Sequence, residues 1–346
     1  MSAETAARPQ YGGIDRFRII AALIIVGIHT YPLASVSEAV NFYVVHVLGR
    51  VAVPFFLMVT GYFLLPRYVV RNACDTEPLM GFVKKTVVIY LLATLLYLPI
   101  SIYAGHYSGG GLFAVIARNI VFDGTFYHLW YLPASIIGVL IVFAFRASLR
   151  RAFVVAVLLY IAGLFGDNYF GVIYGVPLIR NAYEIRFRIF SFTRNGIFYA
   201  PIFLVMGAAM AKRENRVRGW ACVTGLVVSL VVMMLEGYMI RHCGFSRHSS
   251  MYIALVPVMF FLFNLLLSGR GKTSVLLRGI SMWVFILHPL FIIAVRGFAR
   301  GVGLTYLLVE NSLVHFMAVC VLSVAASVLC VELHLRYKRG FKGVQA

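Results

Sequence analysis

Acidic residues are scarce in this sequence. Its 346 residues include only 12 Asp and Glu, and charged residues of both signs make up 12% of the chain. A soluble globular domain is about one quarter charged, because it must present a hydrated surface to water. The sequence also contains no internal repeat and no low-complexity tract. The lack of charge excludes an ordinary water-soluble domain and indicates a polytopic membrane protein.

Cysteine is also sparse, and its spacing carries no motif. The five cysteines are an odd number, they are scattered along the chain, and most lie within or beside apolar runs. Neither a zinc-ligand spacing nor a disulfide framework is present, so we interpret them as packing residues and expect no metal site. They are Cys74, Cys222, Cys243, Cys320 and Cys330.

Apolar residues dominate what is present. They make up 62% of the chain, and the mean hydropathy is +0.90. About 20 consecutive apolar residues cross the hydrocarbon core of a bilayer as a helix. Runs of about this length recur along the whole sequence and predict an all-α membrane bundle of about ten transmembrane helices. The predicted spans are 15–34, 42–65, 82–105, 130–146, 151–166, 195–212, 218–240, 249–268, 279–299 and 311–336.

The 31 Lys and Arg residues give a net charge of +19. In a soluble protein this excess would indicate nucleic acid binding, but in a membrane protein the cytoplasmic loops collect basic residues. Most of the 31 fall on one set of alternating loops, so we expect no nucleic acid partner and both termini in the cytoplasm. The predicted organisation is a cytoplasmic segment at 1–14, a transmembrane domain at 15–336 and a basic, unstructured cytoplasmic tail at 337–346. No small-residue cleavage site follows the first apolar run, so we interpret that run as a retained helix rather than a signal peptide.

Two connections on the opposite side have unusual composition. The segment 181–195 (NAYEIRFRIFSFTRN) alternates Arg186 and Arg188 with aromatic residues, which indicates an amphipathic segment. It is either a solvated interfacial loop or an anion-attracting vestibule. The run 112–122 (LFAVIARNIVF) is too short to span a bilayer and is typical of a re-entrant or interfacial helix.

The first predicted span carries two ionisable residues. Ten residues without charge separate Arg18 from His29, so the two lie about 16 Å apart along a helix. Ionisable groups inside a membrane are costly and indicate a functional site by default. A neutral imidazole accepts protons near neutral pH and suits general base catalysis. The alternative is a hydrogen bond that joins His29 to another helix of the bundle.

Arg50 stands at the outer end of the second span, at the start of GRVAVPFFLMVTGYFLLP (49–66). No Asp, Glu or Lys occurs in that run, so a partner for Arg50 must come from elsewhere. It is a candidate substrate-binding or cavity-lining residue. The alternative is a side chain that extends to the membrane interface.

The sequence FDGTFYHLWYLP (122–133) places His128, Trp130 and Tyr131 at the start of the fourth span. Aromatic residues at this position are typical of the belt that lies at a membrane interface. The alternative is that these three residues line a cavity.

Two further polar residues lie deep in apolar runs. His288 precedes Pro289 in the ninth span, and Glu236 lies in the seventh span. Both are candidate cavity-lining residues. The Glu236 carboxylate is expected to pair with a histidine or with an outer arginine, because an unpaired charge in a membrane is costly.

Four of these stretches together resemble the integral-membrane acyltransferase family 3. They are the Arg18, ten residues, His29 arrangement, RVAVPFFLMVTGYFL (50–64), HLWYL (128–132) and SMWVFILHPL (281–290), in the order expected for that family. The resemblance covers nearly the whole chain. It implies an enzyme that takes an acyl group, usually acetyl, from a cytoplasmic acyl-coenzyme A and passes it to an acceptor hydroxyl on an envelope substrate outside.

The resemblance also implies roles for individual residues. His29 would transfer protons or carry the acyl group transiently, and Arg18 would position the donor. Acetyl-coenzyme A would be a substrate, with no permanently bound cofactor. Many members of the family carry Arg-Arg, two residues, Arg at the cytoplasmic start of the third span. This chain has Lys84, Lys85 and Val88 there, so binding of the acyl-coenzyme A phosphates is carried only by two point charges.

Within the family, the chain looks most similar to the membrane domain of the serine racemases of glycopeptide-resistance clusters. The likeness is carried by residues 13–33, 192–210 and 280–300. In those proteins a soluble racemase domain follows the last span, and nothing similar follows Arg336 here, so we do not expect racemisation from this sequence. This likeness keeps a second hypothesis open, a module that admits serine for a separately encoded racemase. A purely structural or signalling role is the third.

Both leading hypotheses place the protein as a multi-pass protein of a bacterial-type cell membrane. The expected partners are the lipid bilayer, the acyl donor, and an envelope acceptor or an amino acid.

Overall fold

The structure is a computed structural model that describes residues 11–105, 112–212, 214, 217–269 and 271–343. About 77% of the chain is helical, and the described residues contain no β-strand. The all-α fold class is therefore confirmed. The chain divides into two compact units, Met1–Ala52 with Leu262–Ala346 (unit 1) and Val53–Phe261 (unit 2). Each unit is described by itself below.

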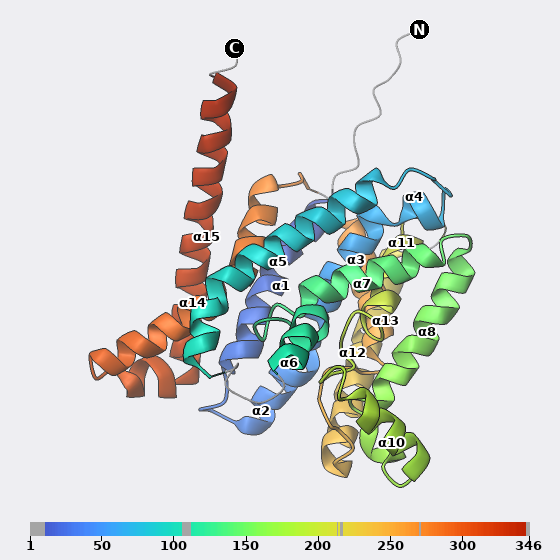
Figure 1. The fold of residues 1–346 in the computed structure, drawn as a ribbon, viewed down its shortest axis with the longest axis horizontal. Helices are drawn as coiled ribbons and strands as arrows, with labels where there is room; N and C mark the ends of the chain where they lie inside the picture. Colours follow the sequence, from blue (N-terminus) through green and yellow to red (C-terminus); the bar gives the residue numbers. More distant parts are fainter. Residues whose placement is uncertain (1–10, 106–111, 213, 215–216, 270, 344–346) are drawn as a thin grey trace. The chain divides into compact units, whose positions relative to one another are not determined.

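Unit 1 is built around three helices, α1, α14 and α15. Side chains from all three form one apolar core that includes Val26, Val284 and Val319. Helices α14 and α15 lie side by side and run in opposite directions, so that Gly279 of α14 packs against Val331 of α15 (Figure 1). The elements of this unit are α1 (Gly12–Thr30), α2 (Glu38–Phe42), the π-helix η1 (Tyr43–Val47), the 3₁₀-helix η2 (Leu48–Val51), the end of α13 (Leu255–Ser268), α14 (Val275–Gly301), the π-helix η5 (Tyr306–Glu310) and α15 (Ser312–Gly343).

The ends of α1 and α14 are fixed by local features of the sequence. Glycines at the start of α1 let its backbone approach the end of α13, because a Cβ on Gly13 would collide with the Leu266 carbonyl. The hydroxyl of Ser274 caps α14 by accepting a hydrogen bond from the Leu277 N–H at 3.2 Å. The Ser274 N–H also donates a hydrogen bond to Asp15 of α1 at 2.8 Å, which brings the start of α1 beside the start of α14.

Unit 2 is organised around α11, whose residues 200–208 are all buried. Helices α7 and α8 both pack on it. The elements are α3 (Ala52–Leu64), α4 (Pro66–Val69), α5 (Glu77–Tyr103), α6 (Leu112–Arg118), the π-helix η3 (Asn119–Asp123), α7 (Tyr131–Ala144), α8 (Leu149–Phe165), α9 (Phe170–Ile173), α10 (Pro177–Arg186), α11 (Ala200–Ala209), α12 (Gly219–Cys243) and the start of α13.

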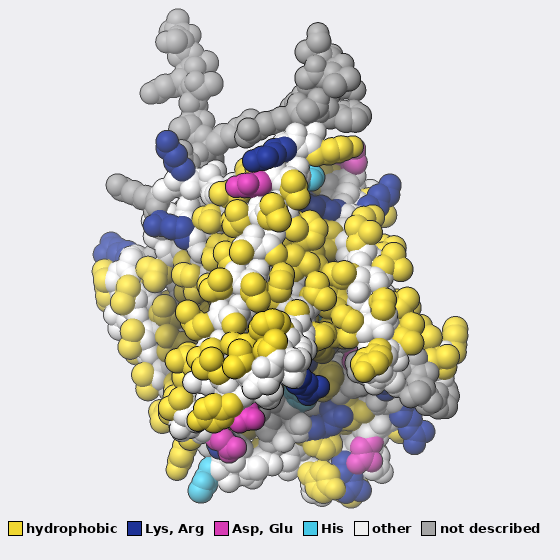
Figure 2. Space-filling view, turned by 90° about the vertical axis from the view of Figure 1, so that its left-hand side faces the viewer, with side chains coloured by type: hydrophobic (Ala, Val, Ile, Leu, Met, Phe, Trp, Pro, Cys, Tyr) yellow, Lys and Arg dark blue, Asp and Glu magenta, His cyan; other side chains and the backbone are white. Residues whose placement is uncertain are grey.

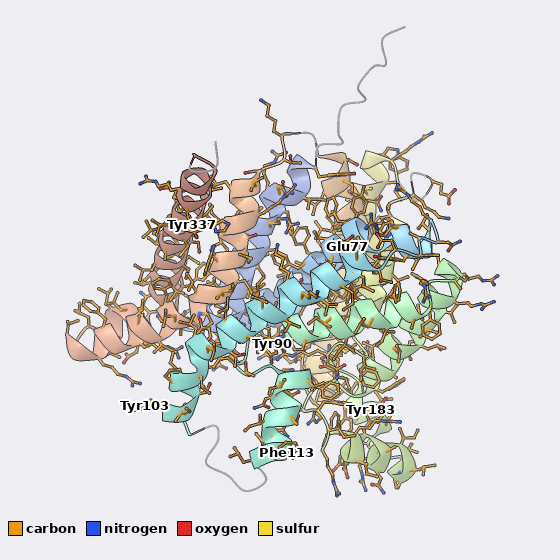
Figure 3. The ribbon with its side chains drawn as sticks, turned by 45° about the horizontal axis from the view of Figure 1, so that its top comes forward. Glu77, Tyr90, Tyr103, Phe113, Tyr183 and Tyr337 are labelled. Carbon is orange, nitrogen blue, oxygen red and sulfur yellow. The ribbon has the colours of Figure 1, made fainter. Side chains whose placement is uncertain are left out.

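Tyr90, half-way along α5, ties this helix to the segment before α7 (Figure 3). Its hydroxyl lies 3.1 Å from the carbonyl oxygens of Asn119 and Ile120 and accepts a hydrogen bond from the Thr125 N–H at 3.1 Å. The run 112–122 therefore forms two short helical turns held at α5, and none of the residues of α6 or η3 is buried.

We expect Gly61→Ala to destabilise the protein. A Cβ on Gly61 would overlap the backbone carbonyl of Leu204 in α11, which cannot move as a flexible side chain would. Overpacking of this kind typically costs about 1–3 kcal/mol. Gly81→Ala in α5 is the matched control, because a Cβ there meets nothing within 4 Å. Thermal unfolding in detergent should show a lower midpoint for Gly61→Ala only, and equal midpoints for the two variants would contradict the predicted clash.

All ten predicted apolar runs contain helices, and within the part of the chain that the structure describes five helices are long and apolar enough to cross a membrane. Hydrophobic side chains cover most of the face drawn in Figure 2. The five helices are Glu38–Leu64, which joins α2 to α3, and α5, α12, α14 and α15, the last counted over Ser312–Tyr337; three shorter apolar helices are α7, α11 and α13.

The sequence also made predictions for the C-terminal tail and for the segment 181–195. The tail was expected to be unstructured from 337, but α15 continues to Gly343, because no Gly or Pro interrupts the sequence before Gly340. In the segment 181–195, Tyr183 and Phe190 are buried and Arg186 and Arg188 are exposed, but Ile185 and Ile189 are exposed as well, so its amphipathic character stays a prediction.

Candidate functional site

His29 lies in the last turn of α1, where the helix ends abruptly. Tyr31 adopts a left-handed conformation (φ 52°), and its N–H donates to the Gly27 carbonyl at 3.0 Å. Pro32 follows and cannot continue the helix. This cap fixes the last turn, so the half-buried imidazole of His29 is held at a defined place in unit 1.

His288 is fully buried in α14, and the proline after it explains its orientation. Pro289 has no N–H, so the carbonyl of Phe285, four residues earlier, loses its helical donor. The Nδ1 atom of His288 lies 2.9 Å from this carbonyl oxygen and 3.0 Å from that of Val284. Carbonyl oxygens only accept, so Nδ1 carries the hydrogen, and Nε2 is the basic nitrogen of the neutral ring.

The two imidazoles stack on each other. The ring centroids of His29 and His288 lie 5.4 Å apart, with 23° between the ring planes. Two positive charges at this separation would repel each other strongly, so the pair carries at most one proton beyond the two neutral rings. A pair of this kind can take up and release a single proton inside an apolar helix bundle, which is the requirement for general acid–base catalysis.

Arg18 lies near the start of α1, in a charged cluster that the sequence analysis did not predict. Asp15 is 1% exposed and accepts hydrogen bonds from Nε and Nη2 of Arg278 at 2.9 and 3.0 Å, and from the Ser274 N–H at 2.8 Å. The Nε atom of Arg18 lies 3.4 Å from the same carboxylate. One buried carboxylate therefore holds two arginines and joins α1 to α14.

Arg50 is buried in η2, with 8% of its surface exposed. Its Nη2 atom donates a hydrogen bond to Nδ1 of His46, one turn earlier, at 3.0 Å. Because a guanidinium cannot accept, Nδ1 of His46 must be unprotonated, and His46 is neutral with its hydrogen on Nε2. The Tyr31 and Phe42 rings lie against His46, with centroids 5.8 and 5.5 Å from its own.

The remaining aromatic candidates, His128, Trp130 and Tyr131, lie in unit 2. His128 is 1% exposed and lies edge-on to Tyr97, with ring centroids 5.1 Å apart. Trp130 contacts the Tyr199 ring and the guanidinium of Arg194, whose carbon lies 5.0 Å from the Trp130 ring centroid. Tyr131 packs on Phe56 instead. His128 and Trp130 are buried and Tyr131 is half-buried, and the choice between an interfacial belt and a cavity lining stays open.

The expected pairing of Glu236 with a histidine or an arginine is wrong. Its carboxylate accepts hydrogen bonds from the Tyr169 hydroxyl (2.7 Å) and from the N–H groups of Ile253 (2.7 Å) and Ala254 (2.9 Å). The two amides directly precede α13, so the carboxylate accepts from backbone donors that have no partner within the helix. Burial, together with the hydrogen bond to Glu236, raises the pKa of the Tyr169 phenol far above its ordinary value, so Tyr169 remains a donor.

Glu236 and Tyr169 also line a cavity of about 630 Å³ in unit 2. The other walls are apolar and include Val228, Ile253 and Phe261. The Glu236 carboxylate already accepts hydrogen bonds from three donors. Two of these donors are backbone N–H groups just before α13, so Glu236 stabilises the start of that helix.

Lys84 and Lys85 are both exposed on α5, and neither forms an ion pair with a described residue. Of the predicted site residues, the structure thus brings together His29 with His288 in unit 1. The residues that the sequence analysis missed there are Asp15, Arg278 and His46. The available signal was spacing: Asp15 precedes Arg18 by three residues and His46 precedes Arg50 by four, which places each pair on one helix face.

Comparisons with known proteins extend over nearly all of the chain. Residues 11–332 match the model of the acyltransferase 3 family, described as "Acyltransferase domain". An amino-acid racemase of Enterococcus faecalis is 44% identical over 332 residues, which cover 93% of this chain and 45% of that protein. A second amino-acid racemase of Enterococcus faecalis is 34% identical over 332 residues, covering 94% of this chain and 46% of that protein. The serine/alanine racemase of Enterococcus gallinarum is 32% identical over 316 residues, covering 90% of this chain and 45% of that protein.

The chain therefore spans about half the length of the curated relatives it matches. No solved structure matches it.

Proposed function

Because the chain belongs to the acyltransferase 3 family, we propose that it moves an acyl group, acetyl in the simplest case, from acyl-coenzyme A to a hydroxyl. The observation that carries this proposal is the stacked pair of His29 and His288, 5.4 Å apart inside unit 1. Acyl transfer to a hydroxyl needs a group that removes one proton and returns it, and a neutral imidazole ring of this pair can do so.

The proposed step uses His29 as the base. The acceptor hydroxyl oxygen forms a bond to the thioester carbonyl carbon while its proton passes to a ring nitrogen of His29. The carbon–sulfur bond then breaks, and the leaving thiolate takes that proton, so the products are an ester and free coenzyme A. His288 is a positioning residue, since Pro289 and two carbonyls fix its ring against His29.

The proposed orientation follows from the basic loops. We place both termini and Arg18 on the cytoplasmic side of a bacterial-type cell membrane, with ten crossings. Arg18 then faces the donor, with Lys84 and Lys85 as weaker phosphate contacts. His29 lies about 16 Å further along α1 and would meet an acceptor from the other face.

The test is release of coenzyme A from acetyl-coenzyme A by vesicles that contain the purified protein. Serine and a detergent extract of bacterial envelope serve as acceptor sources, and the free thiol is measured. We expect acceptor-dependent thiol release that is lost in His29→Ala. Vesicles with folded protein that release no thiol with either acceptor source would count against the proposal.

A second candidate function is translocation of serine without acyl transfer. It is supported by the relatives, which are amino-acid and serine/alanine racemases, and by the lysines that stand in place of the family's arginines at 84 and 85. A separately encoded racemase would be its partner. The measurement is uptake of labelled serine into vesicles with no acyl donor, and absence of uptake with folded protein present would exclude it.

A further inference from the structure

We propose that Arg50, oriented by His46, binds the carboxylate of a small hydroxyl-bearing acid, of which serine is the simplest example with an amino group. This inference rests on the proposed function, because it names the substrate class of the same site. It starts from the charge of Arg50, which is more than nine-tenths buried.

No Asp or Glu among the described residues forms an ion pair with Arg50. Its one hydrogen bond goes to a neutral imidazole, and its Nε atom is buried without a hydrogen-bond partner. Burying an uncompensated guanidinium costs several kcal/mol, so a buried arginine normally has an anionic partner. Here the remaining N–H groups are left for a ligand.

His46 fixes the direction of the guanidinium. Its Nδ1 accepts from one end of the fork, while the Phe42 and Tyr31 rings enclose the imidazole. A planar guanidinium held at one nitrogen presents its other N–H groups in a fixed arrangement that matches a carboxylate. The geometry therefore provides both the charge and the orientation that a carboxylate site needs.

The local backbone also departs from a regular helix at this point. The helical segment from Glu38 to Leu64 changes to π geometry over Tyr43–Val47 and to 3₁₀ geometry over Leu48–Val51. Such interruptions inside helices are frequent at functional sites. Within them, Arg50 is buried and the half-buried His46 packs against Tyr31, the residue that caps α1.

This position adjoins the histidine pair. A Cβ on Gly49 would lie 3.1 Å from Ile28, the residue before His29, and the Tyr31 ring packs on His46. The last turn of α1 therefore touches Arg50's segment through Ile28 and Tyr31, and His288 through His29. A ligand whose carboxylate is bound by Arg50 and which carries a hydroxyl a few ångströms away would present that hydroxyl near the proposed base.

The charge of the site favours a monoanion. Arg50 contributes one positive charge and neutral His46 contributes none, so a carboxylate is matched, whereas a phosphate dianion would leave an excess negative charge in an apolar bundle. This is why we choose a carboxylate over a phosphate group.

The experiment measures binding of labelled serine to the detergent-solubilised full chain by equilibrium dialysis, without an acyl donor. Serinamide and ethanolamine keep the hydroxyl and lack the carboxylate. We expect saturable serine binding, weakened at least 10-fold in Arg50→Gln and to a smaller extent in Arg50→Lys, and at least 10-fold weaker competition by serinamide and ethanolamine. Arg180→Gln is the matched control, because Arg180 already pairs with Glu184 and lies in unit 2.

Size-exclusion elution and the unfolding midpoint show whether each variant is folded. If Arg50→Gln does not fold, the comparison of serine with serinamide on the wild type still tests whether binding requires the carboxylate. Serine binding that is absent in the wild type, unchanged in folded Arg50→Gln, or matched by serinamide would overturn the proposal. Failure of acetyl transfer alone would leave serine binding in place, so the two proposals fail separately.

Discussion

Replacing His29 with alanine is expected to lower acetyl transfer by about 100- to 10,000-fold, the range that a positioned general base contributes. The imidazole is the group that accepts the hydroxyl proton in the proposed step, and it stacks on the His288 ring. His29→Gln should be as inactive as His29→Ala, because an amide hydrogen-bonds but does not take up a proton. The readout is the rate of thiol release from acetyl-coenzyme A.

The control for this prediction is His242→Ala. His242 lies exposed near the end of α12 in unit 2, where it stacks on Tyr238. It tests whether loss of any histidine ring lowers the rate, and we expect no change. Wild-type turnover in folded His29→Ala would exclude His29 as the base while leaving the family assignment untouched.

His288→Phe distinguishes positioning from proton transfer within the pair. Phenylalanine keeps a ring against His29 but loses the Nδ1 hydrogen bonds to the Val284 and Phe285 carbonyls. If His288 only positions His29, this variant should lose much less activity than His29→Ala, and its pH–rate profile should keep the same shape. Equal losses in both variants would indicate that the two rings act together.

The sequence predicted the apolar helices well, because their length and composition are dictated by the bilayer rather than by details of packing. It also identified His29 and His288 as deep polar residues. The sequence could not predict that the two rings stack. They are 259 positions apart in the chain, and only the packing of α1 on α14 brings them together.

The errors have a common physical origin. Glu236 was expected to pair with a charged side chain, but its partners are one hydroxyl and two backbone amides. The types of the residues do not reveal which backbone N–H groups are available as donors. The local part of the site was readable in principle. Asp15 with Arg18, and His46 with Arg50, are helical neighbours. The contact of Asp15 with Arg278 was not readable, because it depends on tertiary packing.

Replacing Asp15 with asparagine is expected to give the largest loss of stability among the substitutions considered. The Asp15 side chain is 2% exposed, and its removal as a charge leaves Arg278 and Arg18 without their shared partner. Breaking a buried ion pair typically costs about 3–5 kcal/mol. Because the Arg278 side chain is 42% exposed and water screens part of its charge, we expect a loss of about 2–3 kcal/mol.

Glu77→Gln provides the matched control, since Glu77 is exposed in the first turn of α5 and forms no ion pair among the described residues. Its unfolding midpoint should equal that of the wild type. A double-mutant cycle of Asp15→Asn with Arg278→Gln then isolates the contact, and a coupling energy of about 0.5–3 kcal/mol is expected for residues that share hydrogen bonds. Coupling within error of zero would show that the contact does not hold α1 to α14.

Asp15→Asn also tests whether Arg18, which contacts Asp15, binds the acyl donor. Asp15 forms an ion pair with Arg18, so Asp15→Asn removes one charged contact that orients the Arg18 guanidinium, while the His29–His288 stack lies about four helical turns away. If Arg18 binds the donor, the KM for acetyl-coenzyme A should rise while kcat changes much less, because binding is weakened and the proton-transfer residues are untouched. A fall in kcat with an unchanged KM would instead mean that the cluster acts through the register of α1 against α14, and Arg18 would lose its proposed role as a donor contact.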